Sequence, residues 1–285
     1  MFNRQKIIDY IEDKHLPDGG YFFGKVEPSG GYDTLLAVKT LSALDVRPKN
    51  SNSIVTFYEK EGESGNLDTI TGLFFAVETM KALGEPINRF QKYGSILKQD
   101  IHLFERHRFN MEDTGSIGLY ETSAHALFTE FVEAELKELY YFVSLSRQLD
   151  MVFDTSRIID FVLSGQNTDG GFGNLAGSQL ATTYYALQTL QLLDYVIPQP
   201  PIFNYLNSEW MTVSYLEDLF WLIESLSLIG KRIPNPQYVD DFLTACWRDN
   251  GGFSRSRTMG ISTIEYTFFA VQLLVRLQKE MNVMK

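Results

Sequence analysis

Apolar residues recur along the chain in a repeating pattern, and the clearest copy lies in the middle. Residues 156–166 place Ile158, Ile159 and Val162 at the spacing of one helix face, which predicts an amphipathic helix. Residues 179–193 are apolar almost all round, as expected of a helix buried on two sides. The segment between them, NTDGGFGNLAGS, ends the first helix and permits backbone angles with positive φ. This unit is therefore predicted to be a helical hairpin.

The same order of outer helix, glycine-rich loop and inner helix returns at both ends of the chain. The two copies are residues 5–15, 16–31 and 32–44, and residues 238–247, 248–262 and 263–277. Weaker copies keep the inner helix without the full loop, at residues 67–83, 119–136 and 215–230. Proline-rich stretches fall between units, where helices must stop. The chain thus predicts six hairpins of roughly 48 residues each.

Hairpins of this kind bury themselves by stacking, with the two-sided helices forming an inner layer. An open solenoid usually ends in polar capping units, whereas here the first and last units are among the best copies. We therefore expect an all-α fold, a closed (α/α)6 toroid of six helical hairpins in two concentric layers. No linker or low-complexity segment splits the chain, so residues 1–285 are predicted to form a single toroid domain.

Composition narrows the functional classes. An aromatic share of 14% requires a large core or a ring-lined cavity. The net charge of −11 repels phosphate backbones, so a nucleic-acid partner is not expected. The single cysteine, Cys246, excludes an internal disulfide and fits a reducing compartment. The N-terminus has no apolar signal region, and the uncharged stretch 174–193 carries glutamines and hydroxyls, so a cytoplasmic protein that does not span a membrane is predicted.

The loop QNTDGGFG, residues 166–173, resembles the Q-x-x-D-G-G-F/W signature of the prenyltransferase and squalene-cyclase repeat. RDNGGFS and PDGGYF are looser copies, and the helices TTYYALQTLQLL and YTFFAVQLL resemble inner helices of protein prenyltransferase β subunits. The resemblance covers three units well and the other three by position. It implies an α/α toroid whose central, aromatic-lined cavity holds isoprenoid chains.

The chain departs from this family at the metal site. Protein prenyltransferases hold zinc with an Asp, a nearby Cys and a His on inner helices. Here Cys246 precedes a glycine loop, and Tyr266 stands at about the position of the zinc His. The four histidines lie elsewhere, at His15, His102, His107 and His125. Because zinc needs three or four converging ligands, no zinc or other cofactor is expected, and the sequence leaves magnesium open.

A second departure concerns proton donation. Class II terpene cyclases protonate an alkene with a D-x-D-D motif at the start of an inner helix. The nearest matches, GGYDT and GNLDT, keep the final acids Asp33 and Asp68. Tyr32 and Leu67 stand where the resemblance puts the proton-donating Asp.

Acidic residues nevertheless share one position at the start of inner helices, at Asp33, Asp68, Glu121 and Glu265. One interpretation is helix capping, because acids satisfy free N–H groups at helix N-termini. The other is that one acid, desolvated by aromatic rings, has a raised pKa and donates a proton. His125 lies four residues after Glu121 on one helix face, as an acid–base partner or an ordinary hydrogen-bonded neighbour. These five residues are the candidates for catalysis.

Three cations follow the glycine loops of the first and last units, at Lys25, Arg255 and Arg257. In a closed ring they would meet at the seam and hold a diphosphate, as similar loop residues do in the family. The alternative is three solvated surface charges. Inner-helix aromatic residues could bind a prenyl chain or stabilise a carbocation, or be plain core. The aromatic candidates for substrate binding are Tyr184, Trp221 and Tyr266.

Two functions fit these observations. The first is a zinc-independent terpene cyclase or prenyltransferase-like enzyme acting on a prenyl diphosphate or polyprenyl chain. Its reaction would start by protonation from an acid such as Asp33 or Glu121, or by diphosphate loss at the basic seam. The second is a non-catalytic toroid that binds a lipid, another hydrophobic small molecule or a partner protein. The missing zinc ligands and the broken D-x-D-D favour the second, while the loops and helices support only the fold.

Overall fold

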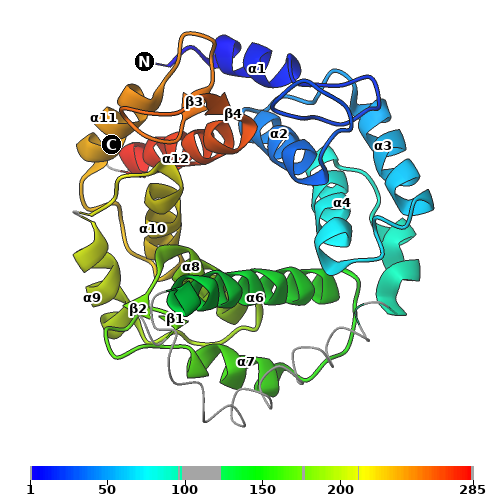
Figure 1. Cartoon of the computed structure of the whole chain (residues 1–285). Coiled ribbons are helices and arrows are strands. Elements are labelled where there is room, and N and C mark those ends of the chain that lie inside the picture. The colour runs from blue at the N-terminus through cyan, green and yellow to red at the C-terminus, as the bar shows by residue number, and fades with distance from the viewer. Residues whose placement is uncertain (1, 96, 98–122, 175–176, 211, 284–285) are drawn as a thin grey trace. The chain divides into compact units, whose positions relative to one another are not determined.

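The computed structural model describes residues 2–95, 97, 123–174, 177–210 and 212–283, and for 123–135 and 281–283 the backbone alone. This part of the chain is mostly helical, as predicted (Figure 1). Among its helices, none combines the length and apolarity that crossing a bilayer requires.

The chain divides into two compact units. The first comprises Met1–Leu67, Phe75–Ile87 and Trp210–Lys285, and the second Asp68–Phe74 and Asn88–Glu209, so that α4 (Ile70–Leu83) is shared. The other elements of the first unit are α1 (Arg4–Glu12), α2 (Gly31–Ala43), α3 (Ser51–Glu63), α10 (Leu216–Leu228), α11 (Pro236–Cys246), β3 (Phe253–Ser254), β4 (Ser262–Thr263) and α12 (Ile264–Val283). Those of the second are the 3-10 helix η1 (Asn88–Tyr93), α6 (Ser123–Gln148), α7 (Thr155–Ser164), β1 (Gly173–Asn174), β2 (Gly177–Ser178), α8 (Leu180–Leu192) and α9 (Gln199–Glu209).

Outer and inner helices differ in burial as the apolar pattern predicts. The outer helix α1 buries one face, through Ile7, Ile8 and Ile11, whereas the inner helix α2 buries the continuous run from Thr34 to Val38. The sequence did not predict the two antiparallel ribbons, β1–β2 and β3–β4, which close the glycine loops before α8 and α12. They form because the loop doubles back after its glycines and pairs with the residues that lead into the inner helix.

Each glycine loop is tied to its inner helix by one threonine. The backbone N–H of the aromatic residue after the two glycines donates to the hydroxyl of a threonine in the first turn of that helix. The pairs are Tyr21 with Thr34 at 2.9 Å, Phe172 with Thr183 at 2.9 Å, and Phe253 with Thr267 at 3.1 Å. The aromatic residues and the threonines are buried, so each backbone N–H would lose its partner without the threonine hydroxyl. The two glycines and the aromatic residue that follows them therefore have a structural role at all three sites.

The first glycine of each loop packs against the outer helix of another hairpin. Gly19, Gly170 and Gly251 have φ angles of +108°, +96° and +93°. A Cβ atom added there would lie 2.3, 2.1 and 2.1 Å from a backbone carbonyl oxygen, of Ser53 in α3, Pro201 in α9 and Lys6 in α1 respectively. Only glycine permits such an approach.

For the last loop, the outer helix that it meets belongs to the first hairpin. Gly251 packs under α1 in the same manner as Gly19 packs under α3, and the inner helices α2 and α12 lie side by side (Figure 1). The predicted contact between the first and last hairpins is therefore confirmed within the first unit.

The close approach of Gly251 to α1 can be tested by adding one methyl group. We expect Gly251→Ala to lose about 1–3 kcal/mol more stability than Gly230→Ala, because overpacking adds to the strain of a positive φ. Gly230 is the matched control, since its φ is +70° and a Cβ there meets nothing within 4 Å. Urea unfolding measures both variants, and equal losses would contradict the close contact.

Candidate functional site

The N-terminal turns of α2 and α12 bring predicted acids together in the first unit. The hydroxyl of Tyr32 donates a hydrogen bond of 2.7 Å to Glu265 Oε1, although 233 residues separate the two in sequence. Asp33 follows Tyr32 in the first turn of α2, and Glu265 lies in the first turn of α12. Asp33 is the third residue of α2 and Glu265 the second of α12, so the predicted shared repeat position is wrong by one residue for this pair. The packing of the two helices nevertheless brings both acids to one small region.

The carboxyl group of Asp33 is bonded to the glycine loop. Its Oδ2 accepts a hydrogen bond of 3.1 Å from the backbone N–H of Phe23. Burial raises the pKa of Asp33; the Phe23 N–H opposes that rise, and the nearby charge of Glu265 adds to it. A carboxyl with a raised pKa keeps its proton to a higher pH than an exposed aspartate, which suits a proton donor.

A third acid, Glu217, starts the neighbouring inner helix α10 and is 8% exposed. Its Oε1 accepts a hydrogen bond of 2.5 Å from Arg255 Nε, while its buried Oε2 has no partner within the described residues. The Arg255 guanidinium also lies 4.2 Å from the centre of the Tyr215 ring. A buried carboxylate requires a compensating charge. Arg255 supplies that charge to Glu217 through their ion pair.

Tyr266 connects the two groups of acids. Burial raises the pKa of its phenol, and the charges of Glu217 and Glu265 raise it further, against the effect of Arg255. The residue at about the position of the family's zinc His therefore has a carboxylate–guanidinium pair as its neighbour.

Two residues of this region, Glu217 and Tyr32, are absent from the sequence-predicted site. A signal for Glu217 existed, because it lies at the start of an inner helix, as Glu265 does. For Tyr32 the sequence shows only the residue before Asp33. Its bond to Glu265 depends on the packing of α2 against α12, which is a tertiary contact.

The three predicted cations each contact a different group. Lys25 Nζ lies 2.6 Å from Asp13 Oδ1, and both side chains are about half exposed. The guanidinium of Arg257 lies 4.9 Å and 4.6 Å from the ring centres of Tyr238 and Phe242 on α11. With Arg255 bound to Glu217, these contacts do not include a shared site for one anion. Their joint binding of a diphosphate stays a prediction.

The aromatic candidates fall in both units. Trp221 on α10 lies 6.4 Å from the Phe269 ring on α12, in the first unit. Tyr184 on α8, in the second unit, lies 5.2 Å from the Tyr185 ring. Each of these aromatic candidates is partly exposed, as is Tyr266, so their rings are not wholly enclosed in core.

The remaining catalytic candidates are Asp68, Glu121 and His125. Asp68 is exposed, just before α4, and belongs to the second unit. Glu121 and the side chain of His125 lie outside the described residues.

A metal-binding group was not expected, and the described residues contain no cluster of three His, Cys, Asp or Glu side chains that could hold an ion. Cys246 is buried, and burial raises the pKa of its thiol to about 11. At neutral pH it is therefore a thiol and a poor metal ligand or nucleophile. His102 and His107 lie outside the described residues.

Comparison with known proteins identifies the family of this chain. The family model described as prenyltransferase alpha-alpha toroid domain matches residues 2–216 and 203–285. No curated protein sequence matches the chain.

Two solved structures share the fold. Candida albicans protein geranylgeranyltransferase-I complexed with GGPP is similar with a TM-score of 0.68 and 15% identity, over 96% of this chain and 91% of that one. A variant of the type II terpene cyclase MstE from Scytonema is similar with a TM-score of 0.55 and 13% identity, over 96% and 94%. At these identities the likeness concerns the fold alone.

The raised pKa of Asp33 predicts a specific dependence of stability on pH. The folded chain holds the Asp33 proton to a higher pH than the unfolded chain, so this residue lowers stability as pH rises from about 3.8 through its folded value. Asp33→Asn removes that loss and keeps an oxygen for the Phe23 N–H. The melting temperature of the variant should therefore rise relative to wild type across this window and stay higher above it.

Thermal unfolding between pH 3 and pH 8 measures this difference. Asp13→Asn is the control, because it removes the same charge from an exposed site in the same unit. A difference between Asp33→Asn and wild type that does not change with pH would show that Asp33 ionises normally.

A metal analysis tests the expectation that the chain has no zinc site. Because Tyr266 replaces a histidine ligand and Cys246 is a buried thiol, we expect well under one zinc per chain after dialysis. Elemental analysis of the purified protein measures the ratio. One bound zinc per chain would instead point to ligands such as His102 and His107.

Proposed function

This chain belongs to the prenyltransferase alpha-alpha toroid domain family, and on that premise we propose that it is a zinc-independent enzyme that protonates a polyprenyl chain. The observation that carries the proposal is the environment of Asp33. Its carboxyl is partly buried, has a raised pKa and is held by the Phe23 N–H at the first turn of an inner helix. These are properties that favour a role as a general acid.

The proposed reaction needs only the proton of Asp33 and the double bonds of the substrate. The π electron pair of one alkene forms a C–H bond with that proton, leaving the Asp33 carboxylate and a carbocation. A second double bond closes on the cation, and loss of a proton from the new cation returns the acid to its starting state. The product is an isomer of the substrate.

Groups around Asp33 suit a developing positive charge. Glu265, held by the Tyr32 hydroxyl at 2.7 Å, places a carboxylate near the reacting carbon. The rings of Tyr32 and Phe75, 5.5 Å apart, add π faces that attract cations.

Protonation is favoured over diphosphate loss by the charges in the first unit. A departing diphosphate needs free cationic donors. Arg255 is bound by Glu217 at 2.5 Å and Lys25 by Asp13 at 2.6 Å. With the Glu265 carboxylate nearby, the region attracts cations and repels a polyanion.

A non-catalytic function is the alternative, in which the chain binds a lipid, a small ligand or a partner protein. The bond between Arg255 and Glu217 favours it, because two polar groups of the region then neutralise each other and not a substrate. The two functions differ in whether a bound isoprenoid is converted to a product.

Turnover of a defined isoprenoid tests the proposal. Geranylgeraniol and geranylgeranyl diphosphate are suitable probes, since the similar Candida albicans protein is complexed with GGPP. Wild type should convert the C20 chain to an isomer of unchanged mass, detected by gas chromatography with mass spectrometry. Asp33→Asn should lower the rate about a hundredfold or more, because general acids contribute about 10²–10⁴ to rates.

The control variant is again Asp13→Asn, which should retain the wild-type rate within about twofold because Asp13 is an exposed partner of Lys25. The wild-type rate should fall as pH rises through the raised pKa of Asp33, since only the protonated acid donates. Release of pyrophosphate would indicate diphosphate loss. Saturable binding without any product would favour the non-catalytic function.

A further inference from the structure

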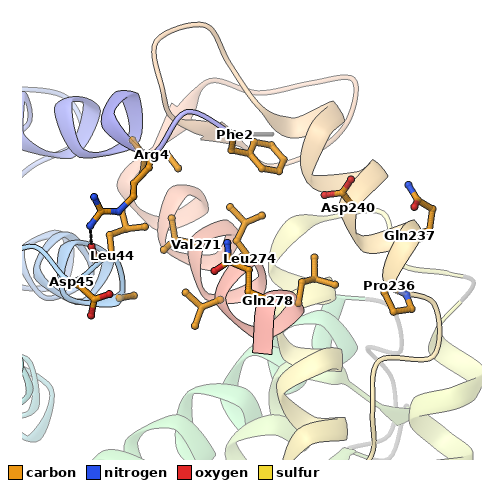
Figure 2. Close-up of a pocket in the computed structure, with 14 residues that line it drawn as sticks. Phe2, Arg4, Leu44, Asp45, Pro236, Gln237, Asp240, Val271, Leu274 and Gln278 are labelled. Carbon is orange, nitrogen blue, oxygen red and sulfur yellow. Dashed lines mark hydrogen bonds between the residues drawn. The ribbon is translucent and has the colours of Figure 1, made fainter. Parts of the chain in front are cut away.

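A pocket of about 510 Å³ lies in the first unit, at the opposite ends of α2 and α12 from the acids (Figure 2). Its lining comes from the end of α2, at Ala43 to Asp45, and from the later turns of α12, at Val271 to Gln278. The outer layer adds the first residues of the chain, including Phe2, and the first turn of α11. This volume falls within the range of about 300–1,000 Å³ that small-molecule sites occupy.

The floor of the pocket is one face of α12. Val271, Leu274, Val275 and Gln278 follow the i, i+3, i+4, i+7 spacing that puts side chains on the same side of a helix. Leu274 and Val275 are only partly buried. Apolar side chains on this face of α12 therefore remain partly uncovered.

Phe2 forms the opposite wall and is itself held in place. Its ring packs 5.6 Å from the Trp247 ring and 5.5 Å from the Phe253 ring, centre to centre. Figure 2 shows Phe2 facing α12 across the space, with Leu274 and Gln278 on the far side. A ligand between them would contact an aromatic ring and an aliphatic helix face.

The charges around the pocket are unequal. Arg4 donates a hydrogen bond to the carbonyl oxygen of Leu44, and Asp45 follows Leu44 on the same side, so these two charges offset each other. Asp240 stands on the other side (Figure 2). It is exposed and makes no ion pair or hydrogen bond within the described part of the chain. The lining thus has a net negative charge, which Asp240 supplies.

The two helix N-termini beside the pocket do not reverse this preference. Helix N-termini attract anions through their free N–H groups. Here the side chain of Asn3 accepts from Lys6 N at 3.1 Å, and that of Asn235 accepts from Tyr238 N at 3.1 Å. Both ends are therefore already partly satisfied.

We propose that this pocket binds a cationic amphiphile, a small molecule with an aliphatic or aromatic body and an ammonium head. The body lies along Leu274 and Val275 beneath Phe2, and the ammonium group donates to the Asp240 carboxylate. Ammonium is the complement of an unpaired carboxylate, and the Phe2 ring adds a further attraction for a cation. This site is separate from the proposed reaction at Asp33 and does not depend on it.

Three ligands of equal chain length test the head group, namely octylammonium, octanol and octanoate. Isothermal titration of wild type should show one saturable site for octylammonium, with octanoate at least tenfold weaker and octanol between them. Asp240→Asn should weaken octylammonium at least tenfold and leave octanol unchanged. Asp241→Asn is the matched control, because it removes the same charge one residue away, from a side chain that does not line the pocket. It should change affinity less than threefold.

Leu274→Trp tests the location by filling the space above α12, and it should abolish binding of octylammonium and octanol. Circular dichroism and the melting temperature show whether this variant folds. If it does not, the comparison of Asp240→Asn with Asp241→Asn still decides the question. Equal affinities for octylammonium and octanoate, equal effects of the two Asp variants, or undiminished binding to folded Leu274→Trp would each overturn the proposal.

Discussion

The missing side-chain carbon of one glycine in each loop determines how hairpins join. At Gly19, Gly170 and Gly251 a carbonyl of another outer helix occupies the space that a Cβ would need. Any other residue at these positions would place its Cβ in a steric clash with that carbonyl oxygen. The threonine hydroxyl of the adjoining inner helix then fixes the loop from the other side, through bonds of 2.9–3.1 Å. The repeated sequence therefore corresponds to a repeated set of contacts, in which the loop glycine meets an outer helix and the threonine hydroxyl binds the loop.

This joint places the chemistry of the first unit. Because the last loop meets α1, α12 lies against α2, and their first turns put Glu265 beside Tyr32 and Asp33. Burial in this region raises the pKa of Asp33, and the nearby charge of Glu265 adds to that rise. Arg255 neutralises the charge of Glu217, so Glu217 adds little negative charge to this region. The packing of α12 against α2 thereby contributes to the raised pKa of Asp33.

Much of the fold follows from local patterns in the sequence. The periodic apolar residues and the double-glycine loops predict the outer helix, the loop and the inner helix at three places, because these signals depend on neighbours a few residues apart. The choice of Asp33 and Glu265 as candidates rests on a repeat position in the same way. The partners of the cations could not be predicted, since Arg255 and Glu217 are 38 residues apart and the length of a side chain decides their contact. The ribbons and the pocket over α12 likewise arise only when distant segments pack.

The contact between α2 and α12 also has a consequence for the order of assembly. Residues near 35 and near 270 must meet, so this contact has one of the longest sequence separations that the chain allows. During synthesis from the N-terminus, α2 emerges with two apolar faces, and the one that α12 covers waits for almost the whole chain to be made. High contact order slows folding and leaves apolar surface open to association with other chains. The first unit is thus the part of this protein that a nascent chain completes last. Its uncovered apolar surface is the part that a cellular chaperone would bind during synthesis.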